Sequence, residues 1–186
     1  MPADPLLSAS QRAFLEASRR AVLATIAPGG RPRLVPICFV VDRDRPIVYT
    51  PIDEKPKRDD DPLTLARVRD IAADPRVTIL VDRWDEDWTQ LAWLRGEGQA
   101  ALIDPGAEHA SAVTALRARY SQYATHGLDE RPLIRITLER VIGWGLIGAE
   151  RGTGATSRKG GVRRHQIMQP GLDGLLTNPN PPKDTR

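Results

Sequence analysis

Hydrophobic residues recur at helical spacing in three segments of the chain. The first segment follows Ser8 and Gln11, whose spacing is that of a capping box at a helix N-terminus. The second carries an apolar face with arginines off it and stops at Asp74-Pro75, and the third begins after Asp104-Pro105-Gly106. The pattern therefore predicts helices at about Ala9–Arg19, Leu65–Ala72 and Ala107–Gln122.

Six further segments are apolar over a short stretch or alternate apolar and polar residues, as strands do. Pro36, within the second of them, indicates an edge, a bulge or an interrupted ladder. Gly96 and Gly98 in the fifth indicate a bulge or a sharp bend. The fourth is almost continuously apolar, which is typical of a central strand. The predicted strands are Ala21–Ile26, Leu34–Val41, Pro46–Thr50, Val77–Val81, Leu91–Ile103 and Leu133–Trp144.

The order of these elements predicts a mainly β, α+β fold. The first three strands are joined by short turns and are expected to form an antiparallel meander. Six mainly antiparallel strands with a few helices favour a small barrel with helices packed outside it. Residues 151–186 hold six glycines and four prolines without periodicity, which indicates a mobile tail. We therefore expect a folded domain over residues 1–150 and a basic Gly/Pro-rich tail over 151–186.

The charge of the chain is unevenly placed. The formal net charge is +3, but residues 151–186 carry seven Lys/Arg against two Asp/Glu, which leaves residues 1–150 at −2. A protein that binds nucleic acid through its folded body would carry the positive charge there. Nucleic acid is therefore not an expected partner of the domain.

The chain shows no membrane span and no signal peptide, and its single cysteine, Cys38, cannot form an internal disulfide. Cys38 lies in a predicted apolar strand, where a buried structural thiol is favoured over a nucleophile. These features predict a cytoplasmic protein.

A cationic loop follows the third predicted strand and is the strongest candidate binding site. That strand ends on the hydroxyl of Thr50, and Lys55, Lys57 and Arg58 follow before the second helix. A hydroxyl, free backbone N–H groups and clustered cations at a strand end suit a phosphate group. The alternative is a solvated charge run beside the acidic residues 59–61.

Other chemistries have little support in the sequence. The three histidines, His109, His126 and His165, show no metal-ligand spacing, and Cys38 has no evident histidine partner. The carboxylates between Asp82 and Asp87 do not match a calcium loop, and a turn beside two tryptophans is favoured. We expect neither a metal site nor a nucleophilic residue.

Taken in order, these segments resemble the split β-barrel proteins related to pyridoxamine 5'-phosphate oxidase. Within that group the chain is most similar to oxidoreductases that use the deazaflavin coenzyme F420. The resemblance covers about residues 8–148, and the acidic Asp59–Pro62 segment departs from the family pattern. The segments that carry it are Ala21–Ile26, Arg31–Pro36, Tyr49–Arg58, Asp74–Val77, Asp82–Trp88, Trp93–Arg95 and Arg140–Trp144.

The resemblance implies a homodimer that holds the cofactor in a groove between two protomers. Thr50, Lys55, Lys57 and Arg58 would then hold the phosphate, with Arg67 or Arg69 as a further candidate.

By the same resemblance, Val35 and Pro36 would lie near the ring, and Trp144 would approach it from the last strand. Among the four tryptophans, half or more are expected in the core or the dimer interface. One or two could form the apolar wall of a substrate pocket. Trp93 is a substrate candidate, and Arg95 could meet an anionic substrate or form a surface ion pair.

The resemblance implies a split-barrel oxidoreductase in which reduced coenzyme F420 passes hydride to a small electrophilic acceptor. The ring would supply the chemistry, which agrees with the lack of an evident acid–base residue. The same fold with FMN is the alternative, because the cationic loop does not distinguish the two cofactors. A cofactor-binding protein without turnover is a third hypothesis, and a binding module that uses the basic tail is the last.

Overall fold

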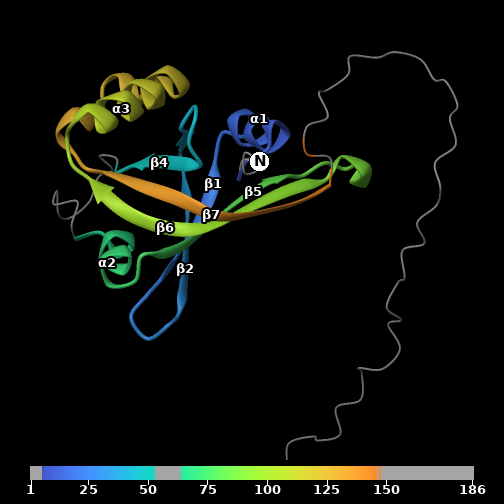
Figure 1. Ribbon diagram of the computed structural model, residues 1–186, viewed down its shortest axis with the longest axis horizontal. Coiled ribbons are helices and arrows are strands. Elements are labelled where there is room, and N and C mark those ends of the chain that lie inside the picture. Colours follow the sequence, from blue (N-terminus) through green and yellow to red (C-terminus); the bar gives the residue numbers. More distant parts are fainter. Residues whose placement is uncertain (1–5, 53–63, 146, 148–186) are drawn as a thin grey trace, which may run out of the picture. The chain divides into compact units, whose positions relative to one another are not determined.

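The computed structural model describes residues 6–52, 64–145 and 147, which fold around one sheet (Figure 1). The described residues form three helices and seven strands: α1 precedes four strands, α2 precedes two and α3 precedes the last, and short 3₁₀ turns connect some of them. The helices are α1 (Ala9–Ala17), α2 (Ala66–Ala73) and α3 (Ala107–Arg119). The strands are β1 (Ala21–Ile26), β2 (Pro32–Ile37), β3 (Val40–Val41), β4 (Ile47–Pro51), β5 (Arg76–Arg83), β6 (Ala92–Ile103) and β7 (Leu133–Gly145).

The sheet is curled so that its two edges approach each other. Its strand order is β2-β1-β5-β6-β7-β4-β3, and all neighbours are antiparallel. Strands β2 and β3 are therefore opposite edges, although only Cys38 and Phe39 separate them in the chain. Three extended residues span at most about 11 Å, so a flat sheet of seven strands cannot have this connection. The expected split barrel is confirmed.

The structure has seven strands where six were predicted, because the segment Leu34–Val41 divides into β2 and β3. The division lies at Phe39, which is fully buried and outside either ladder. The Phe39 N–H donates to the Tyr120 hydroxyl at 3.0 Å, and this hydroxyl donates to the Phe39 carbonyl at 2.9 Å. One side chain thus replaces the missing ladder bonds. Both antiparallel pairings of the predicted meander are present, β1 with β2 and β3 with β4, but the division places them at opposite edges of the sheet.

The other elements lie close to the bounds that the short-range sequence patterns predict. The Ser8 hydroxyl accepts from the Gln11 N–H at 3.2 Å, and the Gln11 side chain accepts from the Ser8 N–H at 3.0 Å, so the capping box is confirmed. Strand β1 has the predicted bounds, and β5 is central, between β1 and β6. The predicted bulge is also present, since the β6–β7 register shifts between Glu97 and Gly98.

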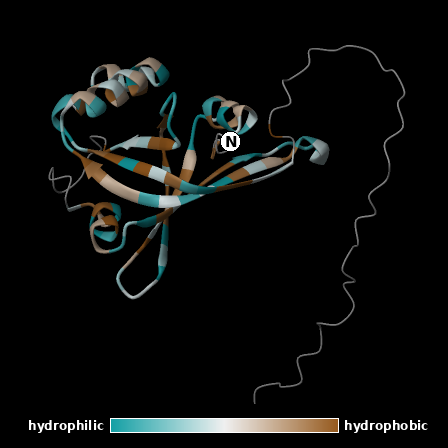
Figure 2. Cartoon of the chain, in the orientation of Figure 1, coloured by the Kyte–Doolittle hydropathy of each residue, from teal (hydrophilic) through white to brown (hydrophobic). Residues whose placement is uncertain are grey.

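Two hydrophobic clusters hold the sheet. The larger fills the barrel interior, where α1 and α2 contribute Phe14, Leu15, Val68 and Ile71. The smaller lies beneath α3 and includes Tyr49. All five residues of β4 are buried, because this strand has the interior on one face and α3 on the other. Hydrophobic and hydrophilic residues alternate along β6 and β7 (Figure 2), which leaves one face of these strands outside the barrel.

Within the described residues, no helix combines the length and the apolar character needed to cross a lipid bilayer. The predicted tail, residues 151–186, lies outside the described residues.

Candidate functional site

Five strands present a shared apolar row on the outer face of the sheet. The pairing registers place the residues of this row directly opposite one another from strand to strand, and we call them the outer row. Only one of the five is charged. The outer row consists of Pro36 (β2), Val22 (β1), Leu80 (β5), Arg95 (β6) and Ile142 (β7).

Two tryptophans extend the apolar surface beside the outer row. Trp93 and Trp144 are opposite each other in the β6–β7 pair, and Trp144 is 55% exposed. Trp84 and Trp88, in the β5–β6 connection, are 69% and 73% exposed. None of the chain's four tryptophans is buried in the core, so of the two expected locations only the dimer interface stays a prediction. The structure does bring four predicted residues, Pro36, Trp93, Arg95 and Trp144, onto one face.

Arg95 is the one cation of the outer row. Its Nε lies 3.0 Å from Glu97 Oε1, and Arg140 Nη1 approaches the other oxygen of that carboxylate at 3.5 Å. The Arg95 side chain is 43% exposed, so the ion pair leaves it accessible from solvent. It can offer its remaining N–H groups to an anion on the outer face.

The free edge of β2 offers few backbone donors. The Ala27 N–H bonds to the Arg31 carbonyl and closes the β1–β2 hairpin, so alternation directs the polar groups of residues 33, 35 and 37 toward β1. Residues 32, 34 and 36 face away from it, and two of these three are prolines without an N–H. Leu34, which is 63% exposed, is therefore the single outward N–H donor of this edge. Such an edge resists strand addition but can donate one hydrogen bond, from the Leu34 N–H, to a planar ligand.

Two other predicted residues lie away from the outer face. Val35 is half-buried and packs against the barrel interior, on the opposite face of β2 from Pro36. Thr50 is 1% exposed in β4, which is next to the other edge of the sheet. Because the sheet curls, the edges β2 and β3 approach each other, and Thr50 lies one strand in from β3.

The start of α2 is the described part of the predicted phosphate site. Its N-cap, Leu65, makes no side-chain hydrogen bond to the first turn, and no acidic residue occupies that turn. Arg67 is half-buried and Arg69 is exposed. Cations near a helix N-terminus oppose the helix dipole, and a bound anion would reverse this. Lys55, Lys57 and Arg58 lie outside the described residues.

A buried ion pair near α2 escaped the sequence analysis. Asp70, 1% exposed, accepts hydrogen bonds from the Arg33 guanidinium and from the Thr25 hydroxyl. The only local signal was an aspartate on the apolar face of a short helix, and its partners are 37 and 45 positions away. Nothing in the sequence marks those partners.

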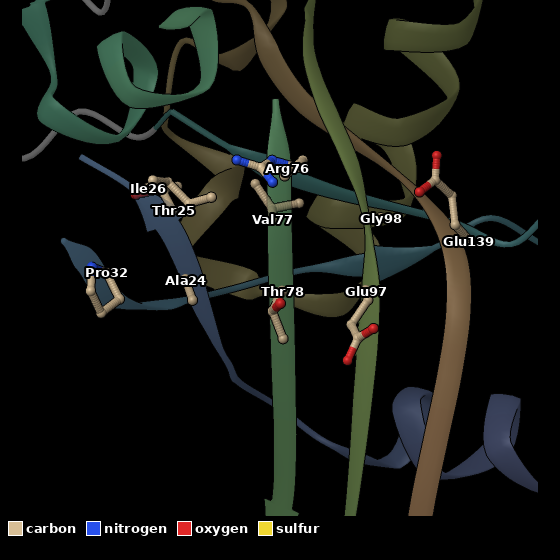
Figure 3. A pocket seen from close by; sticks show the side chains of 10 residues that line it. All are labelled: Ala24, Thr25, Ile26, Pro32, Arg76, Val77, Thr78, Glu97, Gly98 and Glu139. Atoms are coloured by element: carbon tan, nitrogen blue, oxygen red, sulfur yellow. The ribbon is translucent and has the colours of Figure 1, made fainter. Parts of the chain in front are cut away.

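A shallow pocket of about 410 Å³ lies on the outer face of the sheet, over Ala24, Thr78 and Glu97, which are opposite one another on β1, β5 and β6 (Figure 3). Ala24, Ile26 and Pro32 supply apolar walls, and Glu97 and Glu139 lie on β6 and β7. Glu139 is the extra residue of the bulge, and Gln99 donates to it at 2.7 Å. None of the predicted cofactor residues that the structure describes lines this pocket.

A second polar network joins α3 to the β3–β4 hairpin, around a pocket of about 360 Å³. The Tyr49 hydroxyl donates to Glu108 at 2.6 Å, and the Arg45 guanidinium donates to both Asp42 and Glu108. The hydrogen bond from Tyr49 lowers the pKa of Glu108, and that from Arg45 lowers the pKa of Asp42. Burial and the Glu108 carboxylate raise the pKa of Tyr49.

We expect this network to limit stability at both ends of the pH range. The lowered pKa values of Asp42 and Glu108 stabilise the fold above about pH 4, and this contribution is lost as the pH falls. The raised pKa of Tyr49 stabilises the fold below about pH 10, and this contribution is lost as the pH rises. Tyr49→Phe should cost about 1 kcal/mol at pH 7 and flatten the alkaline limb. Urea unfolding across pH checks this, and an alkaline limb that persists in Tyr49→Phe contradicts it.

The histidines have structural surroundings where they are described. His109 is 2% exposed on α3, with Nε2 2.7 Å from the Arg131 carbonyl oxygen. His126 packs edge-on against Tyr123, and His165 lies outside the described residues. In the described part of the chain, no group of three or more His, Cys, Asp or Glu residues is placed to hold a metal ion.

Solved structures share this fold at low sequence identity. The conserved hypothetical protein Rv2991 of Mycobacterium tuberculosis aligns with a TM-score of 0.61 at 21% identity, over 86% of this chain and 97% of its own. An FAD-binding protein of Mesorhizobium loti gives 0.52 at 22% identity, over 74% and 92%. HutZ, the heme storage protein of Vibrio cholerae, gives 0.55 at 16% identity, over 73% and 93%.

The comparison with curated proteins finds no match. A family profile does match, over residues 7–145. This range contains all the described helices and strands. The profile is that of Pyridoxamine 5'-phosphate oxidase. The curled seven-stranded sheet with peripheral helices is the split barrel expected from the resemblance. The chain therefore belongs to the pyridoxamine 5'-phosphate oxidase family.

Proposed function

We propose that this protein is an oxidoreductase in which reduced coenzyme F420 passes hydride to a small electrophilic acceptor. The cofactor would lie between two copies of the chain, with its ring against the outer face and its phosphate near α2. The observation that carries this proposal is the outer face, where Pro36, Trp93 and Trp144 form an accessible apolar surface beside Arg95. An exposed apolar surface of this kind marks a site for a ligand or a partner.

The residues present fit a planar cofactor that bears a phosphate. Leu34 offers one outward N–H at the β2 edge, which could bond the polar rim of a ring. The start of α2 lacks a side-chain cap and carries Arg67 and Arg69, which suits an anion. When bound, the cofactor would supply the hydride chemistry. The chain would orient it, exclude water through the apolar surface and direct Arg95 toward an anionic acceptor.

Paired titrations of the cofactor-stripped protein test this proposal, one with coenzyme F420 and one with FMN, followed by ring fluorescence. Tight binding of F420 alone supports the proposal and justifies a screen of acceptors with the reduced form. A preference for FMN replaces the deazaflavin with the flavin and keeps the site. Binding without turnover of any acceptor favours a carrier or store, and binding of neither cofactor contradicts the proposal.

The cationic loop provides a more specific prediction. Lys55→Ala and Lys57→Ala should each weaken cofactor binding by about 1–3 kcal/mol, the scale for losing a hydrogen bond to a charged group. Arg43→Ala, in the turn between β3 and β4, is the matched control and should leave the dissociation constant unchanged. Unchanged binding in both lysine variants would refute the assignment of the loop to the phosphate.

A further inference from the structure

Asp70 joins α2 to both strands of the β1–β2 hairpin. Its two carboxylate oxygens lie 2.9 and 2.8 Å from Arg33 Nη1 on β2, and the Thr25 hydroxyl of β1 donates to Oδ2 at 2.8 Å. Asp70 and Thr25 are 1% and 0% exposed, whereas the Arg33 side chain is 41% exposed. One buried carboxylate thus connects three elements.

This ion pair is a costly way to hold a helix against a sheet. Removing a carboxylate from water costs several kcal/mol, and a well-packed apolar residue often stabilises a fold as much as a buried pair does. Val68 and Ile71 already pack α2 into the barrel interior. Directional hydrogen bonds add what apolar packing lacks, namely a defined position of the helix along the strands.

The position of α2 along the strands sets the distance between the two ends of the proposed cofactor site. Asp70 lies on the same short helix as Arg67 and Arg69, the described phosphate candidates. Arg33 lies on the same strand as Pro36, the ring candidate on the outer face. The pair is therefore a direct bond between the element that would hold the phosphate and the strand that would hold the ring.

We propose that Arg33 and Asp70 are positioning residues that set the spacing between the phosphate end and the ring end of the cofactor site. This inference rests on the proposed function. Two anchors on a single ligand add their affinities only when their spacing matches that ligand, so a fixed spacing avoids an ordering cost on binding. Neither residue needs to contact the cofactor for this role.

Positioning and simple electrostatics predict opposite changes in phosphate binding for one substitution. Asp70→Asn keeps the shape of the side chain and removes a negative charge from the helix that would hold a phosphate. Electrostatics alone predicts stronger phosphate binding in this variant. Loss of the defined spacing predicts weaker binding, because the ligand can no longer satisfy both anchors at once.

The experiment compares FMN with riboflavin, which has the same ring and no phosphate, on wild-type protein and Asp70→Asn. We expect the dissociation constant for FMN to rise about tenfold, the scale of one lost charge-assisted hydrogen bond, with that for riboflavin within about twofold. If the wild-type protein binds only F420, the coenzyme and its phosphate-free deazaflavin riboside replace this pair. A destabilised fold would weaken the binding of both ligands together. The ratio of the affinity for FMN to the affinity for riboflavin, which we call the affinity ratio, therefore isolates positioning.

Asp74→Asn is the matched control. Asp74 is the C-cap of the same helix, and its carboxylate also binds an arginine, but Arg76 begins the next strand, β5, and this pair connects α2 to neither β1 nor β2. This control should keep the wild-type affinity ratio. Arg33→Lys, which retains the cation, should have an affinity ratio between those of the wild-type protein and Asp70→Asn. If Asp70→Asn does not fold, Thr25→Val takes its place, because it removes a hydrogen bond to Asp70 without changing a charge. FMN should again lose more affinity than riboflavin.

Unchanged or stronger FMN binding in a folded Asp70→Asn overturns the inference and leaves the proposed function intact. An equal loss for FMN and riboflavin also overturns it, since a general loss of structure then explains the effect. Wild-type protein that binds neither flavin nor deazaflavin contradicts the proposed function itself. The two failures are therefore distinguishable.

Discussion

Gly98→Ala is expected to lower the free energy of unfolding by about 3 kcal/mol, because it places a methyl group inside the backbone of the neighbouring strand. A Cβ at Gly98 would lie 2.0 Å from the Thr137 carbonyl oxygen and 2.9 Å from Leu138 Cα. Neither atom can move without breaking the β6–β7 ladder at the bulge. The smaller chain entropy of alanine in the unfolded state offsets less than about 1 kcal/mol of this cost.

Gly96→Ala, two residues earlier on the same strand, is the matched control. Its Cβ would meet the ends of two side chains, Leu138 Cδ2 at 2.9 Å and Ile79 Cγ1 at 3.1 Å, and no backbone atom closer. Side-chain ends can shift, so we expect a loss of about 1 kcal/mol. Urea unfolding of both variants measures the difference. Equal losses would contradict the view that the backbone approach at the bulge requires glycine.

The bulge illustrates what short-range patterns can predict. Two glycines in a long strand indicated it, just as Ser8 and Gln11 indicated the start of α1. Each signal depends on residues within a few positions, and the physical cause is equally local: a missing Cβ in one case and a reciprocal hydrogen bond in the other. The family resemblance added the curl of the sheet, which no single segment encodes.

Features that depend on distant residues could not be predicted in this way. The strand Leu34–Val41 divides because Tyr120, 81 positions from Phe39, takes over the backbone hydrogen bonds of that residue. The pair between Arg33 and Asp70 likewise needs the three-dimensional fold to bring β2 to α2. Polar partners of this kind have no periodicity, so only the structure shows them.

The strand β5 is apolar for a different reason on each of its faces. Its near-continuous apolar run suggested burial on both faces, and β5 is indeed central. Its burial nevertheless alternates, and Leu80 points outward at 38% exposure. The apolar residues of the outer face are what a strand needs when a second protein or a ligand covers it. The sequence therefore did carry a signal for the outer face: β5 has more apolar residues than its one buried face requires.

Leu80→Lys is expected to convert the proposed homodimer into a monomer and to weaken cofactor binding at least about tenfold. Leu80 occupies the middle of the outer row, between Val22 and Arg95. A lysine there would be buried in the dimer interface next to another cation, and burying an unpaired charge costs several kcal/mol. In the separate chain the same side chain would stay at the surface, so the fold should be retained.

Leu6→Lys provides the matched control, because Leu6 is 37% exposed and precedes α1, outside the sheet. Sedimentation velocity and cofactor titration on the wild-type protein and both variants measure the two effects together. Loss of dimer and of binding in Leu80→Lys alone supports a cofactor site shared between protomers. A dimer that persists in Leu80→Lys shows that the outer face is not the interface. A monomer that still binds the cofactor shows that one chain completes the site without the dimer interface.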